Sequence, residues 1–180
     1  DLYRLQSLNA RITLAFNWVN MAIASDKTQI DKTQIKSHHD LYEDDFCLWI
    51  EQALVLLRQG NLRDLDLENL LEEIEDMGNS QKQALESNLK VILMHLLKYK
   101  YQPEKRSNSW LYTLTEHRQR IRKAFKNSPS LKRHFLQEFA DVYLDAKKLA
   151  AIETGLPSQT FPAASPFTPD QVTDEEYLPE

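Results

Sequence analysis

Val91-Ile92-Leu93-Met94-His95-Leu96-Leu97 is the most apolar run in the sequence and decides its fold. The run is far too short to span a membrane, which takes about 20 apolar residues. It has the length of a buried helix segment, and amphipathic patterns with one apolar stripe each precede and follow it. The run therefore predicts the central helix of a small bundle, around which the other helices pack.

The composition of the 180-residue chain fits a single all-α domain with appendages. Hydrophobic residues make up 42% of the chain and charged residues 27%, as in globular proteins, and the presence of only 3 glycines favours helices joined by short loops. Cys47 is the only cysteine, which excludes an internal disulfide framework and a cysteine-based metal site. A reducing compartment fits this composition, so we expect a cytoplasmic protein.

The chain is expected to begin with an extension, residues 1–39. Apolar residues at helical spacing predict an amphipathic helix over 2–24. Export after a signal peptide and a natural start at Met21 are competing interpretations, and the asparagines that interrupt the apolar run weigh against export. A linker follows, in which the five-residue unit 26–30 is repeated as 31–35.

A bundle of about five helices is predicted over residues 40–156. Gly60 and Gly78 are expected to end the first two helices, and Pro103 the central one. The prolines of residues 157–180 rule out regular helix over most of the tail, and its aromatic residues predict that it packs on the bundle. The predicted helices run from about Asp40 to Gly60, Asp66 to Met77, Ser80 to Tyr101, Ser107 or Ser109 to Phe125, and Ser128 to Gly155.

Charge is strongly segregated along the chain. Residues 40–76 hold 12 acidic and 2 basic side chains, a net charge of −10, whereas residues 98–133 hold 11 basic and 2 acidic ones, a net charge of +9. The two segments either neutralise each other or form opposite faces. The total charge of −5 gives no support for a general attraction to nucleic acid or membranes. The basic fourth helix, with Trp110 and Tyr112, nevertheless makes nucleic-acid binding a candidate function.

Carboxylates and histidines supply the candidate metal ligands. Helical phase puts Glu68, Glu72 and Glu75 on one flank of the second predicted helix, where like charges repel unless cations or a metal neutralise them. His95 in the apolar run and His117 in the next apolar stripe point inward and need polar partners. Glu72, Glu75, His95 and His117 are thus candidate ligands of a divalent metal, with ion pairs and core histidines as the alternative.

Arg118 lies at the edge of the same apolar stripe. It can bridge to Glu72 or Glu75, or it can hold a substrate phosphate. The acidic string 72–76 is a weak match to the paired-glutamate metal motif of all-α nucleotide pyrophosphatases, because around Glu86 the second acidic pair is missing. The sequence contains no Walker loop, nucleophile elbow, zinc signature or dinucleotide fingerprint.

A set of motifs extends from the start of the predicted bundle to the tail. They are Leu41-Tyr42-Glu43-Asp44-Asp45-Phe46 with Trp49, the acidic stretch 65–78, His95-Leu96-Leu97-Lys98, Ser109-Trp110, Glu116-His117-Arg118 and Phe167-Thr168-Pro169-Asp170. With these motifs the chain from about Asp40 to its end resembles the bacterial family filed as domain of unknown function 29. The resemblance implies an all-α fold and a cytoplasmic location, and it assigns no mechanism and no catalytic residues.

These observations predict a non-enzymatic interaction or regulatory protein that binds another protein, or a second copy of itself, through charged helix faces. A metal-dependent phosphoester hydrolase is the alternative, with Glu72, Glu75, His95 and His117 as ligands and Arg118 as phosphate holder. Nucleic-acid binding through the basic fourth helix is the third candidate. The leading prediction needs no cofactor and no membrane, and a divalent metal belongs only to the hydrolase.

Overall fold

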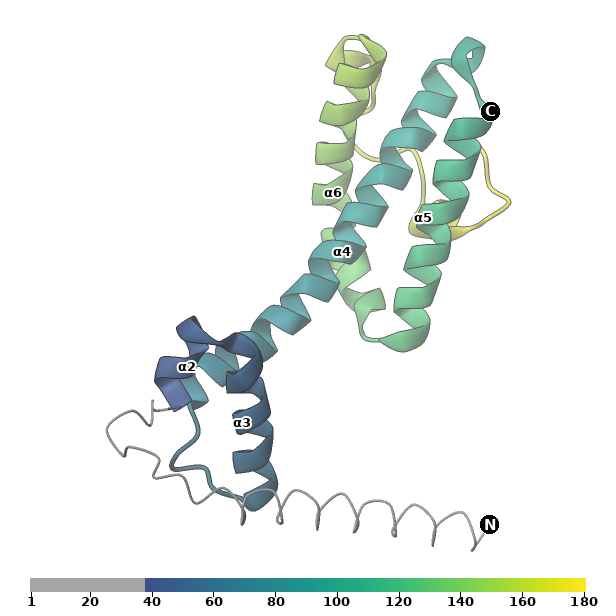
Figure 1. Ribbon diagram of the computed structural model, residues 1–180. Helices are drawn as coiled ribbons and strands as arrows, with labels where there is room; N and C mark the ends of the chain where they lie inside the picture. Colours follow the sequence, from purple (N-terminus) through teal and green to yellow (C-terminus); the bar gives the residue numbers. More distant parts are fainter. Residues whose placement is uncertain (1–37) are drawn as a thin grey trace, which may run out of the picture. The chain divides into compact units, whose positions relative to one another are not determined.

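The computed structural model describes residues 38–180, and these are all-α, as predicted (Figure 1). The described residues form six α-helices and no strand. The predicted helix over 2–24, the repeated linker and the start at Met21 lie outside the described residues. The chain forms two compact units that divide after Asp66. This boundary falls inside the segment 40–156 that was predicted as one bundle.

The described part of the first unit contains α2 (His38–Asp44) and α3 (Phe46–Gln59). One helix was predicted here, and the structure divides it at Asp45. The Asp45 side chain caps α3 by accepting a hydrogen bond from the Leu48 amide at 3.0 Å. Gly60 ends α3 in the left-handed region with φ of 70°, as predicted.

His38 ties the first unit together, a role that no sequence motif indicated. Its buried ring stacks on Trp49 with 5.3 Å between the ring centroids. Its Nε2 donates to the Trp49 carbonyl at 2.9 Å, while its Nδ1 accepts from the Asp66 amide, also at 2.9 Å. Because the amide can only donate, the proton of this ring lies on Nε2.

The second unit (Leu67–Glu180) is built on α4 (Leu67–Tyr101). The helices α5 (Asn108–Asn127) and α6 (Leu131–Thr154) both pack against the C-terminal half of α4 (Figure 1). The apolar run sits where they meet, and Ile92, Leu93, Leu96 and Leu97 are completely buried. Burial of each such side chain contributes roughly 2 kcal/mol to stability.

The predicted break at Gly78 is wrong, because α4 is one continuous helix through that residue. Glycine inside a helix costs only about 1 kcal/mol relative to alanine and, unlike proline, removes no backbone donor. Packing of the C-terminal half of α4 is sufficient to offset that cost. A Cβ on Gly78 would meet no atom within 4 Å, so this residue faces open space.

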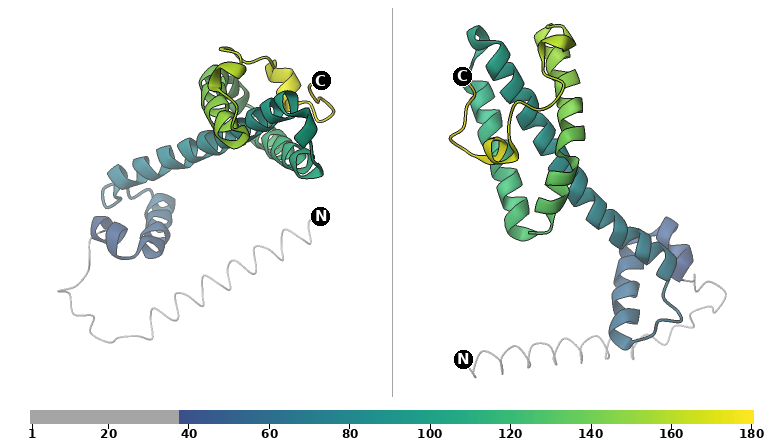
Figure 2. Two further views of the ribbon diagram at one scale, coloured as in Figure 1. Left: turned by 90° about the horizontal axis from the view of Figure 1, so that it is seen from above. Right: turned by 180° about the vertical axis from the view of Figure 1, so that it is seen from behind.

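The tail 157–180 folds back over the second unit (Figure 2). Phe161, Phe167 and Val172 are buried in the same core as the three long helices. The tail is mostly irregular, and its only described α-helix is the short α7 (Pro169–Thr173), which begins at a capping box formed by Thr168 and Gln171. Single 3₁₀ turns, η2 (Pro103–Lys105) and η3 (Ser158–Thr160), follow α4 and α6.

Candidate functional site

The N-terminal half of α4 carries a row of exposed apolar side chains. Leu67, Leu71, Ile74 and Met77 are 48%, 60%, 57% and 67% exposed, and we call these four residues the α4 stripe. The buried residues of α4 begin only at Leu85. Figure 2 shows that this half of the helix extends past the ends of α5 and α6. The apolar face of α4 thus continues beyond the bundle that covers its other half.

Carboxylates accompany the α4 stripe along its whole length. Residues 67–80 contain five acidic side chains and no basic one. Glu68, Glu72 and Glu75 are all exposed. Like charges four residues apart on a helix repel each other. A surface that brings cations to this flank would relieve the repulsion while it covers the apolar row.

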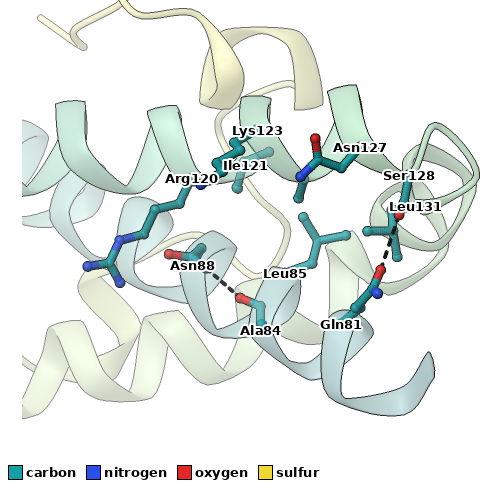
Figure 3. A pocket seen from close by; sticks show the side chains of 11 residues that line it. Gln81, Ala84, Leu85, Asn88, Arg120, Ile121, Lys123, Asn127, Ser128 and Leu131 are labelled. Atoms are coloured by element: carbon teal, nitrogen blue, oxygen red, sulfur yellow. Dashed lines mark hydrogen bonds between the residues drawn. The ribbon is translucent and has the colours of Figure 1, made fainter. Parts of the chain in front are cut away.

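A groove of about 350 Å³ lies between α4 and α5, next along the helix from the α4 stripe (Figure 3). We call it the α4–α5 groove. Its floor is apolar and includes Leu85, Ile121 and Leu131. Lys123 and Arg120, whose guanidinium pairs with Glu116, line its wall. Its volume is that of a small ligand site or of a slot for one or two apolar side chains.

The four predicted metal ligands do not come together in one chain. Because α4 is continuous, the 20 residues from Glu75 to His95 span about 30 Å, and Glu72 lies farther still. The prediction of a single metal site from these four residues required the helix to end at Gly78. Because α4 continues through Gly78, that prediction is corrected as well. Within residues 38–180 no group of three or more His, Cys, Asp or Glu side chains is placed to hold a metal ion.

Both candidate histidines have protein partners. His95 Nδ1 donates to the Val91 carbonyl, one turn back on α4, at 2.9 Å. His117 Nδ1 lies 2.7 Å from Oδ1 of Asn88, whose amide group donates to the Ala84 carbonyl. Burial lowers the pKa of both histidines, with Lys98 adding to the effect at His95 and Arg120 at His117.

Acidification is expected to destabilise the protein through His95. Its pKa in the folded state lies below the ordinary value of 6.5, so the unfolded state binds the proton first as the pH falls through 6.5. His95 therefore has no effect on the pH dependence above that value, and stability decreases below it. The variant His95→Gln should reduce this slope by up to about 1.4 kcal/mol per pH unit.

Urea unfolding at several pH values between about 5 and 8 measures both slopes. The comparison uses slopes because the substitution also changes stability at neutral pH. Equal slopes in the wild type and in His95→Gln would show that His95 does not link proton binding to folding.

Arg118 takes neither of its predicted roles. It is buried, and its guanidinium donates to backbone carbonyls of the tail: Nε to Val172 at 3.0 Å, Nη2 to Tyr177 at 2.9 Å, and further bonds of 3.4 Å to Gln171 and Glu175. Burial lowers the pKa of the Arg118 guanidinium, and the nearby carboxylates Asp174 and Glu175 offset only part of this effect. Arg118 thus anchors the tail to α5 and is not available to Glu72, Glu75 or a phosphate.

Lys98 is a buried cation, and no sequence motif predicted the residues that surround it. It is 7% exposed, its ammonium pairs with the Glu153 carboxylate, and its Nζ lies 4.6 Å from the centroid of the Trp110 ring. These three residues come from α4, α6 and α5, so one side chain links all three long helices. One turn later Gln102 donates to the Thr154 carbonyl at 3.1 Å, which gives a hydrogen-bond donor to a carbonyl at the end of α6 that has no partner within the helix.

The model of the family described as domain of unknown function DUF29 matches residues 41–178. The chain belongs to this family. No curated protein and no solved structure is significantly similar to the chain. None of the described helices is both long and apolar enough to cross a membrane.

The DUF29 region includes the features of the candidate site. It begins within α2 and ends three residues after Glu175, so the α4 stripe, the α4–α5 groove and the tail anchored by Arg118 all belong to it. The motifs of the family resemblance supply Lys98, Trp110 and Arg118, and only the fold reveals what they contact. No sequence motif indicated the α4–α5 groove, because its floor is made of apolar residues that read as ordinary core positions.

Proposed function

We propose that this protein is a non-enzymatic interaction protein that binds another protein through the N-terminal half of α4. The observation that carries the proposal is the α4 stripe, a row of large apolar side chains on a segment that α5 and α6 do not cover. Amphipathic helices use such rows to pack against a partner helix or to enter a groove. The proposed activity needs no cofactor, and we place it in the cytoplasm because Cys47 requires no oxidising compartment.

The acidic residues of 67–80 define the chemistry of the partner surface. It combines apolar side chains with nearby lysine or arginine, because residues 67–80 hold five acidic side chains and no basic one, and such a segment favours a positive surface opposite it. Complementary charge speeds association and selects the partner, while apolar burial supplies most of the affinity. Binding should therefore weaken with salt but persist at high ionic strength.

The two competing functions have less support. Hydrolysis by a metal centre loses its candidate site once Glu75 and His95 lie about 30 Å apart on one helix. Nucleic-acid binding by α5 has less support because much of the positive charge of this helix is already engaged. Arg118 binds the tail, Arg120 pairs with Glu116 and Arg122 pairs with Glu175.

Photo-cross-linking from the α4 stripe tests the proposed function. A photoreactive phenylalanine derivative at position 74, in cells that produce the protein, is expected to give a covalent adduct with one defined partner. Ile152 on α6 is the matched control, because it is also a helical isoleucine and is 77% exposed. Probes at position 152 should not yield that adduct.

The substitution Leu71→Asp should abolish the adduct formed from position 74 without lowering the melting temperature, because Leu71 is 60% exposed. Adducts of equal yield from positions 74 and 152, or the absence of any adduct from position 74, would refute the proposed function.

A further inference from the structure

We infer that the α4–α5 groove is a binding site for a small amphipathic anion, an apolar chain that ends in a single carboxylate. The groove is separate from the α4 stripe, so the inference does not depend on the proposed function. It is drawn from the lining of the groove, from the hydrogen bonds that its polar residues leave unmade, and from the charge of the two helices that enclose it.

The floor of the groove fits the apolar part of such a ligand. Leu85, Ile121 and Leu131 are buried core residues that come from α4, α5 and α6 (Figure 3). Beside them the two walls carry Ala84 and Ala124, where larger side chains would fill the space. A volume of about 350 Å³ lies at the lower end of the range for small-molecule sites. An apolar chain laid on this floor removes both surfaces from water.

The polar residues of the groove have unused hydrogen-bond donors. Asn88 is engaged by the protein through both ends of its amide group. Gln81 accepts a hydrogen bond from Ser128 at 3.1 Å through its oxygen, which leaves the amide nitrogen available. Within residues 38–180 this nitrogen, the Lys123 ammonium and the Asn127 side chain have no hydrogen-bond partner. An ammonium and an amide nitrogen only donate, so these groups suit a ligand that accepts.

The two helices that enclose the groove are basic. Residues 77–101 of α4 contain four lysines and one acidic residue, Glu86, whose carboxylate lies 2.7 Å from His134 Nε2. The helix α5 contains five basic residues and one acidic residue, Glu116, which pairs with Arg120. Both carboxylates are thus engaged, and no acidic residue lines the groove. Such a surface attracts anions and repels cations.

Lys123 sets the charge of the ligand. Arg120 pairs with Glu116, so Lys123 is the one cation of the groove lining without an ion pair in the described part of the chain. One ammonium matches one carboxylate, whereas phosphate groups are typically bound by several charge-assisted hydrogen bonds. Asn127 lies one turn after Lys123, on the same flank of α5, and can donate to the second carboxylate oxygen. The carboxylate therefore lies on the α5 wall, and the chain covers the floor.

Calorimetric titration of the full chain with sodium octanoate tests the inference, with 1-octanol and octylammonium as probes of equal length. The expected result is saturable binding of one octanoate per chain. The affinity for 1-octanol should be at least about tenfold lower, because the alcohol lacks the charge-assisted hydrogen bonds. Octylammonium should give no saturable binding. Equal affinities for octanoate and 1-octanol, or no saturable binding of octanoate, would overturn the inference.

Three substitutions locate the site. Ala84→Phe fills the groove and should abolish octanoate binding, while the melting temperature of the free protein stays nearly unchanged because Ala84 is exposed. Lys123→Glu should lower the affinity at least about tenfold. The matched control is Lys126→Glu, on the same helix but outside the groove lining, which should change the affinity less than about twofold because salt screens distant charges. Equal losses from the two lysine variants, or undiminished binding to Ala84→Phe, contradict the proposed site.

Methyl resonances give a readout on the unmodified protein. On addition of octanoate, the chemical-shift changes should centre on Leu85, Ile121 and Leu131 and spare Ile74 of the α4 stripe and the exposed Ile152 of α6. Changes centred on Ile74 or Ile152 would show that octanoate merely coats exposed apolar side chains, and the inference would be wrong. The proposed function is tested by cross-linking from position 74, so either proposal can fail without the other.

Discussion

Replacing Arg118 with alanine is expected to detach the C-terminal tail and to lower the free energy of unfolding by about 4 kcal/mol. The side chain is 2% exposed and donates to the carbonyls of four tail residues. Truncation leaves the buried Val172 carbonyl and three half-buried carbonyls without this donor, and it opens a cavity beside Val172, which is itself completely buried. Urea unfolding measures the loss of stability, and hydrogen exchange of the tail amides shows where it acts.

Arg120→Ala is the matched control for this prediction. Arg120 lies on the same helix, but its side chain is 56% exposed and pairs only with Glu116 one turn earlier. Such pairs contribute at most about 0.5 kcal/mol. Arg118→Lys should be intermediate, because one ammonium cannot reach the carbonyls that the planar guanidinium reaches together. If Arg118→Ala unfolds like Arg120→Ala, with the tail amides still protected, another contact holds the tail.

The helical content could be predicted from the sequence because it depends on local patterns. Apolar spacing, Gly60 and Pro103 each act within a few residues, and the structure follows them. Gly78 misled the prediction because a glycine ends a helix only when the chain leaves the helix there; the backbone cost is about 1 kcal/mol and packing elsewhere decides. The continuity of α4 therefore depends on packing across the whole second unit, and a short stretch of sequence around Gly78 does not contain that information.

The candidate site was harder to predict because its partners are distant in sequence. Helical phase indicated correctly that His95 is buried, yet the phase cannot show that its partner is the Val91 carbonyl and not a metal. Arg118 binds residues more than fifty positions later, in a tail whose prolines give no periodic signal. The acidic row at Glu72 was visible in the sequence, whereas its exposure became clear only when α5 and α6 proved to end short of it.

Replacing Lys98 with alanine is expected to lower the free energy of unfolding by about 3 kcal/mol, because the buried stem of the side chain is lost together with its charge contacts. Lys98→Met keeps most of the stem and should cost only about 1 kcal/mol. Glu153→Gln removes the charge that pairs with the buried ammonium and leaves the cation facing Trp110 alone. That variant should cost about 2 kcal/mol, less than a fully buried pair because the Glu153 side chain is 45% exposed.

A double-mutant cycle of Lys98→Met and Glu153→Gln separates the charge from the packing. Once the cation is absent, Glu153 has no buried partner to neutralise, so the second substitution should add almost nothing to the first. The expected coupling between the two sites is therefore about 2 kcal/mol, measured by urea unfolding at pH 7. Additive losses would mean that Glu153 stabilises α6 independently of Lys98. The burial of this lysine would then depend on the Trp110 ring and the packing of its stem, and the ion pair would be incidental.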